Sequence, residues 1–431
     1  MEKKISGWGN NRFIKSKIYF PKKISEIKKL IKPNTIARGL GRSYGDSSIQ
    51  PNSTIITTKL DKILYFNDKI GILEAQSGIT IETILKTIVK KGWFLPVTPG
   101  SKKITLGGMV ASNVHGKNHH KVGSFKDHII NLKIINQNKK ILICSKEKNN
   151  RLFNYTVGGM GLTGIIYSCK FKLKKIKSNL IYQEKIRNNN LKETINSIKE
   201  SHNWEYNVSW IDTSASKKNL GRSILTRGKF IDDKVSKYCN YEKKIIFPKI
   251  FPNWFLGAFF IRILNFLYFN FSNLNKKKTD IDSFFYPLDK VENWNVAYGK
   301  NGFISYQCLI PYKNAYKVIK KILGLIKDKK IYSFVSVLKS MGKNDGYLSF
   351  GSPGFTIVFD FPIYKNIYNT LDKIDQIVLT NNGRLYLTKD SRVSNENFRK
   401  INKVFFGKDF KKFRKNSSKI FNSLQSERLK I

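Results

Sequence analysis

The sequence predicts an α+β protein with two domains. Short strands and amphipathic helices follow one another, but without the regular strand–helix–strand rhythm of a doubly wound parallel sheet. A chain of 431 residues is long enough to bury more than one hydrophobic core, so we expect two domains. Glycine-rich turns in the first part of the chain lead directly into strands, which is untypical of a nicotinamide-binding Rossmann domain.

The alternation of apolar and polar residues predicts most of the elements. Strands are expected over residues 54–58, 70–76, 130–135, 165–173, 302–310, 331–339, 356–361 and 384–388. Helices are expected over residues 81–91, 313–327 and 366–380 and in the basic tail 395–423. Thr80 is the expected N-cap of the first helix and Gly92 its stop, and Gly383 ends the third helix.

Residues 251–271 form an aromatic-rich stretch that is long enough to span a bilayer but contains Arg262. As a helix, the stretch would gather Arg262, Asn265, Asn270 and Asn273 on one polar side, and three lysines follow it. Two interpretations stay open. The helix either lies in a membrane interface, or it is buried with its polar side at the protein surface. We prefer the membrane interface.

Charge and cysteine content argue against several classes of function. The formal net charge is +49, but the lysines are spread from end to end and no zinc-finger, helix-turn-helix or RNA-binding motif accompanies them. We therefore expect compositional drift and no nucleic-acid partner. The four cysteines are far apart without a CxxC pair, so we expect neither a metal site nor a disulfide framework. The N-terminus lacks an apolar signal-peptide core, which predicts a protein in the cytoplasm or peripherally on the inner membrane.

Three glycine-rich turns give the first indication of a ligand. They are ARGLGRSYGDSS at residues 37–48, TPGSKKITLGGMVASNVHGKNHHKVGSF at 98–125 and GGMGLTG at 158–164. Such turns offer backbone N–H groups to a pyrophosphate, and Arg38 or Arg42 adds positive charge. They suit one large dinucleotide such as FAD. The histidines clustered at the second turn lack carboxylate or cysteine partners at ligand spacing, so no metal is expected there.

Together with SGWGN at residues 6–10 and RLYLTKDSR at 384–392, these turns resemble the decaprenylphosphoryl-β-D-ribose 2-oxidase family of vanillyl-alcohol-oxidase-like flavoproteins. HGKNHH followed by GSF, and the YLxKDSR motif, are more specific than glycine spacing alone. The resemblance implies a PCMH-type FAD-binding domain over residues 1–177, completed by 384–431. It implies a substrate domain over 178–383, including the membrane-proximal segment 251–271, with an antiparallel sheet over the flavin.

The resemblance also implies the residues that hold FAD. Around the pyrophosphate these are Arg38, Gly39, Leu40, Gly41, Arg42, Ser43, Tyr44, Gly45, Asp46, Ser47 and Ser48. Along the flavin they are Gly100, Thr105, Leu106, Gly107, Gly108, Ser112, Asn113, Val114 and His115, with Ile166 at the adenine end and Tyr386 at the ring system. Relatives with covalent flavin carry a histidine in the first glycine loop. Arg42 occupies the matching position here, so we expect non-covalent FAD.

Members of the family oxidise the 2-hydroxyl of a polyprenylphosphoryl ribose to a ketone, and flavin accepts the hydride. A separate nicotinamide-dependent short-chain reductase completes the epimerisation to the arabinose form used in cell-envelope polysaccharides. The resemblance implies that Lys389 is catalytic, either as a base with a lowered pKa or as a group that holds the sugar or the flavin, and His115 is the rival base. The implied substrate residues are Tyr44, Lys117, Trp210, Gln307 and Lys339.

One strand departs from the family pattern. In GFTIVFDFP, Thr356 and Val358 stand where mycobacterial members typically carry Asn and Cys, which leaves the exact sugar open. Two other functions also stay open. One is a soluble aldonolactone or alditol oxidase of the same flavoprotein superfamily, and the other is a basic nucleic-acid-binding protein.

Overall fold

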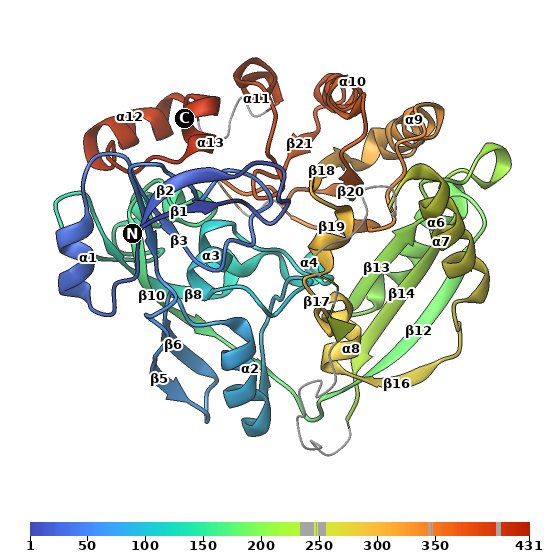
Figure 1. Cartoon of the computed structure of the whole chain (residues 1–431). Helices are drawn as coiled ribbons and strands as arrows, with labels where there is room; N and C mark the ends of the chain where they lie inside the picture. Colours follow the sequence, from blue (N-terminus) through green and yellow to red (C-terminus); the bar gives the residue numbers. More distant parts are fainter. Residues whose placement is uncertain (233–244, 247, 249–255, 344–345, 347, 402–406) are drawn as a thin grey trace.

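The computed structural model describes residues 1–232, 245–246, 248, 256–343, 346, 348–401 and 407–431 of the protein. Within these residues helices pack on mainly antiparallel sheets in two parts, so the predicted α+β class is confirmed. In Figure 1 the blue and cyan N-terminal elements lie at the left, and the green strands lie at the right. The red C-terminal helices lie at the top, above the blue elements.

Two sheets form the first part. Strands β1 (Glu2–Ile5), β2 (Ile14–Tyr19), β4 (Ser53–Ile56) and β3 (Thr35–Arg38) lie side by side in that order. The second sheet is antiparallel, with the order β5 (Ile63–Asn67), β6 (Ile72–Gln76), β10 (Ile165–Lys172), β8 (Ile129–Ile135) and β9 (Ile141–Cys144). Its apolar side chains pack against α2 (Ile81–Ile88) and α3 (Leu106–Ala111) in one buried cluster.

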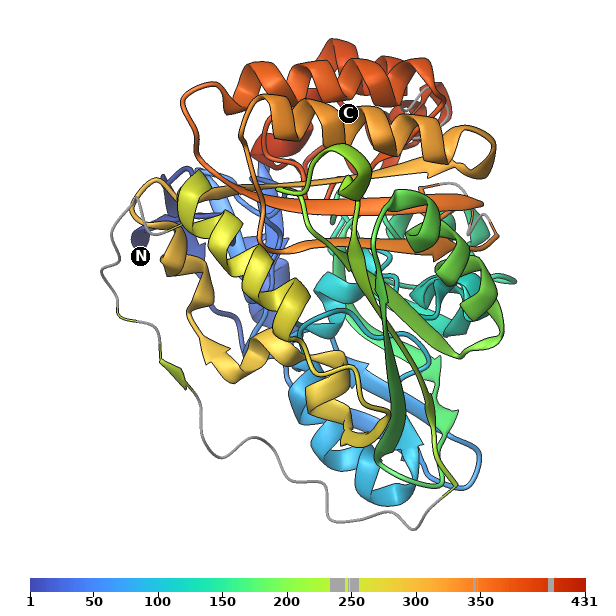
Figure 2. The same ribbon diagram turned by 90° about the vertical axis from the view of Figure 1, so that its right-hand side faces the viewer.

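The second part is built on one eight-stranded antiparallel sheet. Its order is β16 (Lys277–Asp280), β12 (Leu180–Asn188), β14 (Ser223–Phe230), β13 (Tyr206–Ile211), β19 (Ser336–Met341), β20 (Gly354–Pro362), β18 (Phe303–Pro311) and β21 (Arg384–Leu385). One face packs with α6 (Leu191–Glu200), α9 (Ala315–Asp328) and α10 (Ile367–Thr380). Figure 2 shows α9 and α10 running above the orange strands of this sheet. The other face aligns Gln307 with Val358, Val358 with Val337, and Val337 with Trp210.

The chain returns to the first part at its C-terminal end. After β21 come α11 (Asn395–Ile401), α12 (Lys408–Ser417) and α13 (Leu424–Leu429). Thr35 and Phe421 form a parallel bridge, and Leu424 N donates to Ile49 O at 3.0 Å. The tail therefore packs beside the end of β3 and the first glycine turn. The domain limits, 1–177 with 384–431 against 178–383, stay a prediction.

Most predicted elements occur with slightly shifted ends. The Thr80 side chain caps α2 by accepting a hydrogen bond from Thr83 N at 3.0 Å, and Gly92 ends the following turn with φ at 77°. Three elements differ. β19 begins at Ser336 because Ser333 hydrogen-bonds through its hydroxyl to the Asp360 carbonyl (2.9 Å) rather than through a strand ladder. β21 has two residues, and the expected helical tail 395–423 contains α11 and α12, with α13 beyond its expected end.

Helix α7 (Ala258–Phe271) covers most of the predicted aromatic segment, whose residues 251–255 lie outside the described residues. The expected polar side is wrong for Asn265, which is fully buried and donates to Asp212 Oδ1 at 3.0 Å. Phe269 is also buried, with the Arg222 guanidinium 4.3 Å from its ring centroid. Polar and cationic contacts therefore hold the inner side of α7.

The outer side of α7 is mainly aromatic. Phe259, Phe266 and Phe271 are 68%, 53% and 75% exposed. Figure 2 shows α7 as the yellow helix at the near surface of the molecule. Among the described residues, no helix has both the length and the apolar character needed to cross a membrane.

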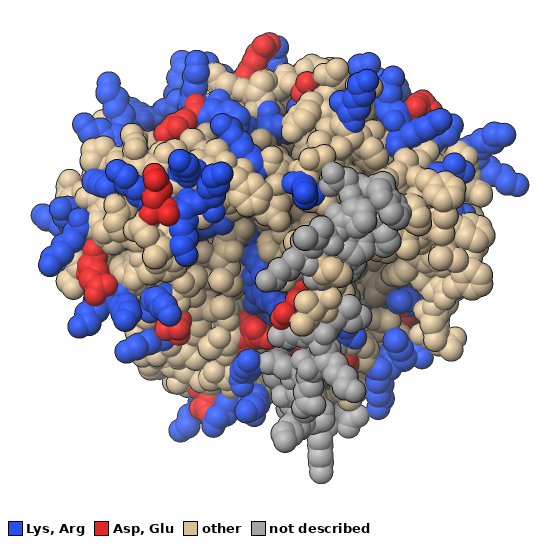
Figure 3. Space-filling model, viewed as in Figure 1, with Lys and Arg blue, Asp and Glu red and all other residues tan. Residues whose placement is uncertain are grey.

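Lysine and arginine side chains are distributed over the surface in the view of Figure 3. They surround the molecule on this face and do not gather into a single stripe. A protein that binds nucleic acid usually concentrates its basic residues on one face or along one helix. The distribution on the visible face fits compositional drift.

Candidate active site

The first glycine turn lies between the N-terminal segment and the loop that carries Lys389. Gly9 N donates to Tyr44 O (3.1 Å), and Tyr44 N donates to Thr388 O (2.9 Å). A Cβ on Gly45 would lie 2.2 Å from the Asp390 carbonyl oxygen. Glycine at this position therefore allows the turn to touch residues 388–390 directly.

Charged residues of this turn have different partners. Arg38 donates to the Ser6 carbonyl (2.6 Å), and Arg42 stacks on the Trp8 ring with its guanidinium 3.7 Å from the ring centroid. The Nε atom of Arg42 is buried without a hydrogen-bond partner among the described residues. Asp46 instead forms a salt bridge with Arg428 of α13 (2.9 Å), so its carboxylate holds the tail.

The second glycine turn lies directly against the first. Thr105 caps α3 by accepting a hydrogen bond from Gly108 N at 3.3 Å. A Cβ on Gly39 would lie 2.1 Å from Thr105 Oγ1, so the two turns are in contact. A Cβ on Gly100 would meet no atom within 4 Å. The two turns thus form one wall, which has open space beside the backbone at Gly100.

The remaining predicted FAD residues lie along this wall or behind it. Leu106, Val114 and Ile166 are buried in the apolar cluster of the first part. Gly107 N donates to Ser77 O at 2.7 Å, and Asn113 donates through its side chain to Ser349 Oγ at 3.1 Å. The other predicted residues of the first turn are Leu40, which is exposed, Gly41, which has φ at 66°, and Ser43, Ser47 and Ser48.

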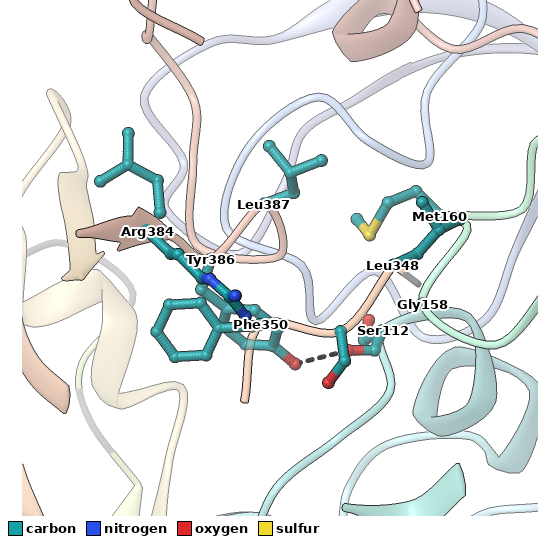
Figure 4. A pocket seen from close by; sticks show the side chains of 10 residues that line it. Ser112, Gly158, Met160, Leu348, Phe350, Arg384, Tyr386 and Leu387 are labelled. Atoms are coloured by element: carbon teal, nitrogen blue, oxygen red, sulfur yellow. Dashed lines mark hydrogen bonds between the residues drawn. The ribbon is translucent and has the colours of Figure 1, made fainter. Parts of the chain in front are cut away.

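The third glycine turn borders a hollow in the structure. Gly158 and Met160 line it together with Ser112, Phe350 and Tyr386. In Figure 4 the Phe350 and Tyr386 rings lie next to each other, and the Tyr386 hydroxyl donates to the Ser112 carbonyl at 2.9 Å. All three glycine turns therefore lie near one region between the two parts of the fold.

These residues fit FAD. The second turn leaves open space beside the backbone at Gly100, and the buried Arg42 Nε is a donor without a partner among the residues that the structure describes. Backbone amides and a guanidinium are the groups that bind a pyrophosphate. An extended dinucleotide along the wall accounts for this donor set.

His115 is the centre of a polar cluster that joins the two parts. Its Nε2 lies 3.0 Å from Gln307 Nε2, and its Nδ1 lies 2.8 Å from Lys339 Nζ. The same Gln307 atom is 3.0 Å from Thr356 Oγ1. The His115 ring also packs 5.2 Å from the Tyr386 ring. Both ring nitrogens of His115 therefore face protein partners.

Lys389 lies on the opposite side of the cluster. Its Nζ is 3.6 Å from the centroid of the Tyr44 ring and 4.0 Å from Asp360 Oδ1. Asp360 is fully buried on β20 and also accepts a short hydrogen bond from Ser305. The predicted residues Tyr44, Lys389, His115, Gln307 and Lys339 thus meet at one face of the eight-stranded sheet.

Two predicted substrate residues have other contacts. Lys117 donates to the Phe284 carbonyl, and its Nζ is 4.5 Å from the centroid of the Phe284 ring. Trp210 donates to the Phe334 carbonyl at 2.9 Å and packs 4.7 Å from the Tyr268 ring of α7. Trp210 therefore links the sheet to α7, three strands away from Gln307.

Burial changes the acid–base behaviour of the cluster. Burial, followed by the nearby Lys339, lowers the pKa of His115 well below its usual value. Burial lowers the pKa of Lys117 to about 7. Burial and repulsion from Lys117 and Lys389 lower the pKa of Lys339 to about 7. Burial also lowers the pKa of Lys389, whereas Asp360 raises it.

Residues 17–145 match the FAD binding domain family. Over 377 residues the chain is 32% identical to decaprenylphosphoryl-β-D-ribose oxidase of Mycolicibacterium smegmatis, an alignment that covers 84% of this chain and 82% of the relative. The chain belongs to the decaprenylphosphoryl-β-D-ribose oxidase family. Its cofactor is FAD, and it is an FAD-dependent oxidoreductase.

Other relatives are more distant or shorter in their match. An uncharacterized protein of Streptomyces coelicolor is 22% identical over 336 residues, which cover 74% of this chain and 90% of that protein. D-lactate dehydrogenase of Anaerostipes hadrus is 28% identical over 134 residues, 30% of this chain and 28% of the dehydrogenase. The similarity to the decaprenylphosphoryl-β-D-ribose oxidase family therefore extends well beyond the length of an FAD-binding domain.

Asp360 and Phe350 also belong to the active site, but the sequence did not identify them. Asp360 could have been found, because strand alternation places it on the same face as Thr356 and Val358. Phe350, whose ring lies 5.7 Å from the His115 ring, comes from a loop and carries no such signal.

Of the cysteines, Cys144, Cys169 and Cys308 are buried and free, and Cys239 lies outside the described residues. The described residues contain no group of three or more metal-binding side chains.

Proposed function

We propose that this enzyme oxidises the 2-hydroxyl of a polyprenylphosphoryl ribose to a ketone, in the first half of an epimerisation to the arabinose form used in cell-envelope polysaccharides. The observation that carries the proposal is the 32% identity to decaprenylphosphoryl-β-D-ribose oxidase over 84% of the chain. An alignment of that extent reaches beyond the expected FAD-binding domain into the expected substrate domain. A nicotinamide-dependent short-chain reductase is the proposed functional partner, because the ketone must be reduced to complete the epimerisation.

FAD, when bound, supplies the acceptor for the hydride that leaves the carbinol carbon. The protein must position the sugar and deal with the hydroxyl proton. Lys389 is proposed to hold the hydroxyl or to take its proton, with His115 as the alternative acceptor. Lys117 in its charged form suits a phosphodiester, and Lys339 is a further proposed substrate residue. Tyr44, Trp210 and Gln307 are proposed to complete the substrate site.

The test is an anaerobic titration of the purified yellow protein. Polyprenylphosphoryl ribose is expected to bleach the absorption of the oxidised flavin, and free ribose and free alditols are expected not to. Bleaching by a free alditol or aldonolactone, without bleaching by the lipid-linked sugar, would support the soluble oxidase instead. A flavin that the lipid-linked sugar leaves oxidised contradicts the proposal.

The outer side of α7 supports a peripheral contact with the membrane that holds the polyprenyl chain. Besides its exposed phenylalanines, the helix exposes Ile263 and Leu267, and three exposed lysines follow at 276–278. An aromatic helix face flanked by lysines suits the interface of an anionic bilayer. The proposed location is therefore the cytoplasm or the inner membrane surface.

Co-sedimentation with phosphatidylglycerol vesicles tests this contact. Replacing both Phe259 and Phe266 by Glu is expected to lower the partition coefficient on the order of a hundredfold, because two aromatic side chains no longer insert into the bilayer. Tyr368→Glu is the matched control, since Tyr368 is 48% exposed on α10. Equal partitioning of the double variant and the control contradicts the contact.

A further inference from the structure

Two buried lysines of the active site have opposite surroundings. We propose that Lys339, held by His115 and the Gly116 carbonyl, takes the proton of the oxidised hydroxyl, whereas Lys389 stays charged throughout. This division of roles rests on the proposed function, because it assigns the proton that alcohol oxidation releases. It replaces two lysines of undefined role by one base and one fixed cation.

Burial lowers the pKa of Lys389, but the two nearest groups, Tyr44 and Asp360, favour its charged form. Its ammonium lies 3.6 Å from the centroid of the Tyr44 ring, a distance at which an aromatic face attracts a cation. Asp360, 4.0 Å away, is a buried carboxylate whose charge needs a cation nearby. Loss of the proton from Lys389 would remove both interactions. A group held in this way suits electrostatic positioning of a substrate better than proton uptake.

The surroundings of Lys339 favour its neutral form. Its Nζ lies 2.8 Å from His115 Nδ1 and 3.2 Å from Gly116 O, and neither partner carries a negative charge. The charged groups that act on it are Lys117 and Lys389, and both repel a proton. On the neighbouring strand β20, the residue opposite Lys339 is Thr356, which is uncharged. His119 is one of the groups that lower the pKa of His115, after burial and Lys339.

The hydrogen bonds of Lys339 also leave a lone pair available. A neutral amine has two N–H groups and one lone pair. His115 Nδ1 and Gly116 O are two acceptors within hydrogen-bond distance, so they occupy both N–H groups. This arrangement requires the His115 proton on Nε2 and a flip of the Gln307 amide. The flip turns Gln307 Oε1 toward that proton and gives up the donation from Gln307 Nε2 to Thr356 Oγ1. His115 is then a positioning residue with both nitrogens engaged.

The step balances without any further reactant. The C–H bond of the alcohol breaks with its electron pair going to the flavin, so the sugar is oxidised and the cofactor reduced. The O–H bond breaks with its proton going to the Lys339 lone pair, and the C=O bond forms. Lys339 becomes an ammonium beside the neutral imidazole of His115. Its charge is removed when the proton passes to solvent between turnovers.

Stopped-flow reduction of the FAD-loaded enzyme by polyprenylphosphoryl ribose tests the division of roles. In the unchanged enzyme the reduction rate is expected to rise as the pH increases through about 7, because the Lys339 amine must lose its proton first. Lys339→Arg keeps the charge but not the base, so the rate is expected to fall about a hundredfold and to lose this rise. Its substrate affinity, measured from the perturbed flavin spectrum, is expected to stay within a few-fold. Lys389→Arg is the matched control and is expected to keep the rise.

A measurement without substrate separates this proposal from the proposed function. In protein with ¹⁵N-labelled lysine, a side-chain nitrogen that titrates near pH 7 and is missing from Lys339→Arg supports a neutral Lys339. A Lys339 nitrogen that titrates near the usual value of about 10 overturns it. Flavin reduction of Lys339→Arg at the unchanged rate also overturns it. Failure of the lipid-linked sugar to reduce any form of the enzyme rejects the proposed function and leaves the titration result standing.

Discussion

Lys389 contacts both parts of the fold, because it lies over the Tyr44 ring of the first glycine turn and beside Asp360 of β20. Lys389→Ala removes this cation without removing a backbone contact. We expect a folded, FAD-loaded protein whose flavin reduction in a single turnover falls about a hundredfold or more. Thermal melting and the flavin spectrum serve as controls for folding and loading. A normal reduction rate in this variant would remove Lys389 from the mechanism.

Arg42 stands where relatives with covalent flavin carry a histidine, so we expect non-covalent FAD. Its guanidinium stacks on Trp8, and an arginine forms no stable bond to flavin carbon. We expect all of the FAD to leave the protein when it is unfolded in guanidinium chloride and passed through a filter that retains the polypeptide. Yellow colour that stays with the unfolded chain would contradict non-covalent binding.

For single residues, the sequence predicted which side chains belong to the active-site cluster better than it predicted their contacts. Lys389, His115 and Gln307 could be identified because they lie in motifs or strands that resemble those of the decaprenylphosphoryl-β-D-ribose 2-oxidase family. The contact of Lys117 with the Phe284 carbonyl depends on a short helix from the other part of the chain, which no local pattern indicates. The Asp46 carboxylate was expected near the cofactor, but its salt bridge joins residues far apart in sequence.

At the element scale, prediction succeeded where one face of an element is buried. α9 and α10 show such periodic burial, and their predicted ends are within a few residues, as are those of the strands β8 and β10. β12 was missed because charged or polar residues occupy both of its faces between positions 183 and 187. Its two neighbours in the sheet, β14 and β16, supply partners for these side chains.

Helix α7 is held by a polar contact that only the structure reveals. Asn265 donates to the buried Asp212 carboxylate, so Asn265→Ala leaves this carboxylate with one donor fewer. We expect a loss of about 1–3 kcal/mol in the free energy of unfolding and faster hydrogen exchange in α7. Asn270→Ala on the exposed side is the control, with an expected loss under about 0.5 kcal/mol. Equal exchange in both variants would show that Asn265 does not hold the helix.

For the whole molecule, the sequence predicted two parts but not how they meet. The order of the eight-stranded sheet brings β19 between β13 and β20, although more than 120 residues separate β13 from β19 in the chain. Local periodicity carries no information on such pairings. The contact of the tail with β3 is also a long-range pairing that local periodicity does not predict. The resemblance implied it, and residue patterns did not.

The last helix connects the first glycine turn to the loop that carries Lys389. Arg428 of α13 contacts Asp46 and Asp390, each at 2.9 Å. Arg428→Met leaves two largely buried carboxylates facing each other without their cation. We expect the free energy of unfolding to fall on the order of 3 kcal/mol at neutral pH and FAD affinity, measured by flavin fluorescence quenching, to fall with it.

The pH dependence of this loss distinguishes a charge effect from a packing effect. Burial already raises the pKa of Asp46 while Arg428 lowers it, so removing Arg428 raises that pKa further. The folded variant then binds more protons than its unfolded chain, and its stability relative to the unchanged protein is expected to recover as the pH falls from 7 toward 5. Arg428→Lys, which keeps the charge, should lose less stability and show a smaller recovery. A stability difference that is independent of pH would mean that the methionine variant suffers from lost packing alone, and the two loops would then not depend on the charge of Arg428.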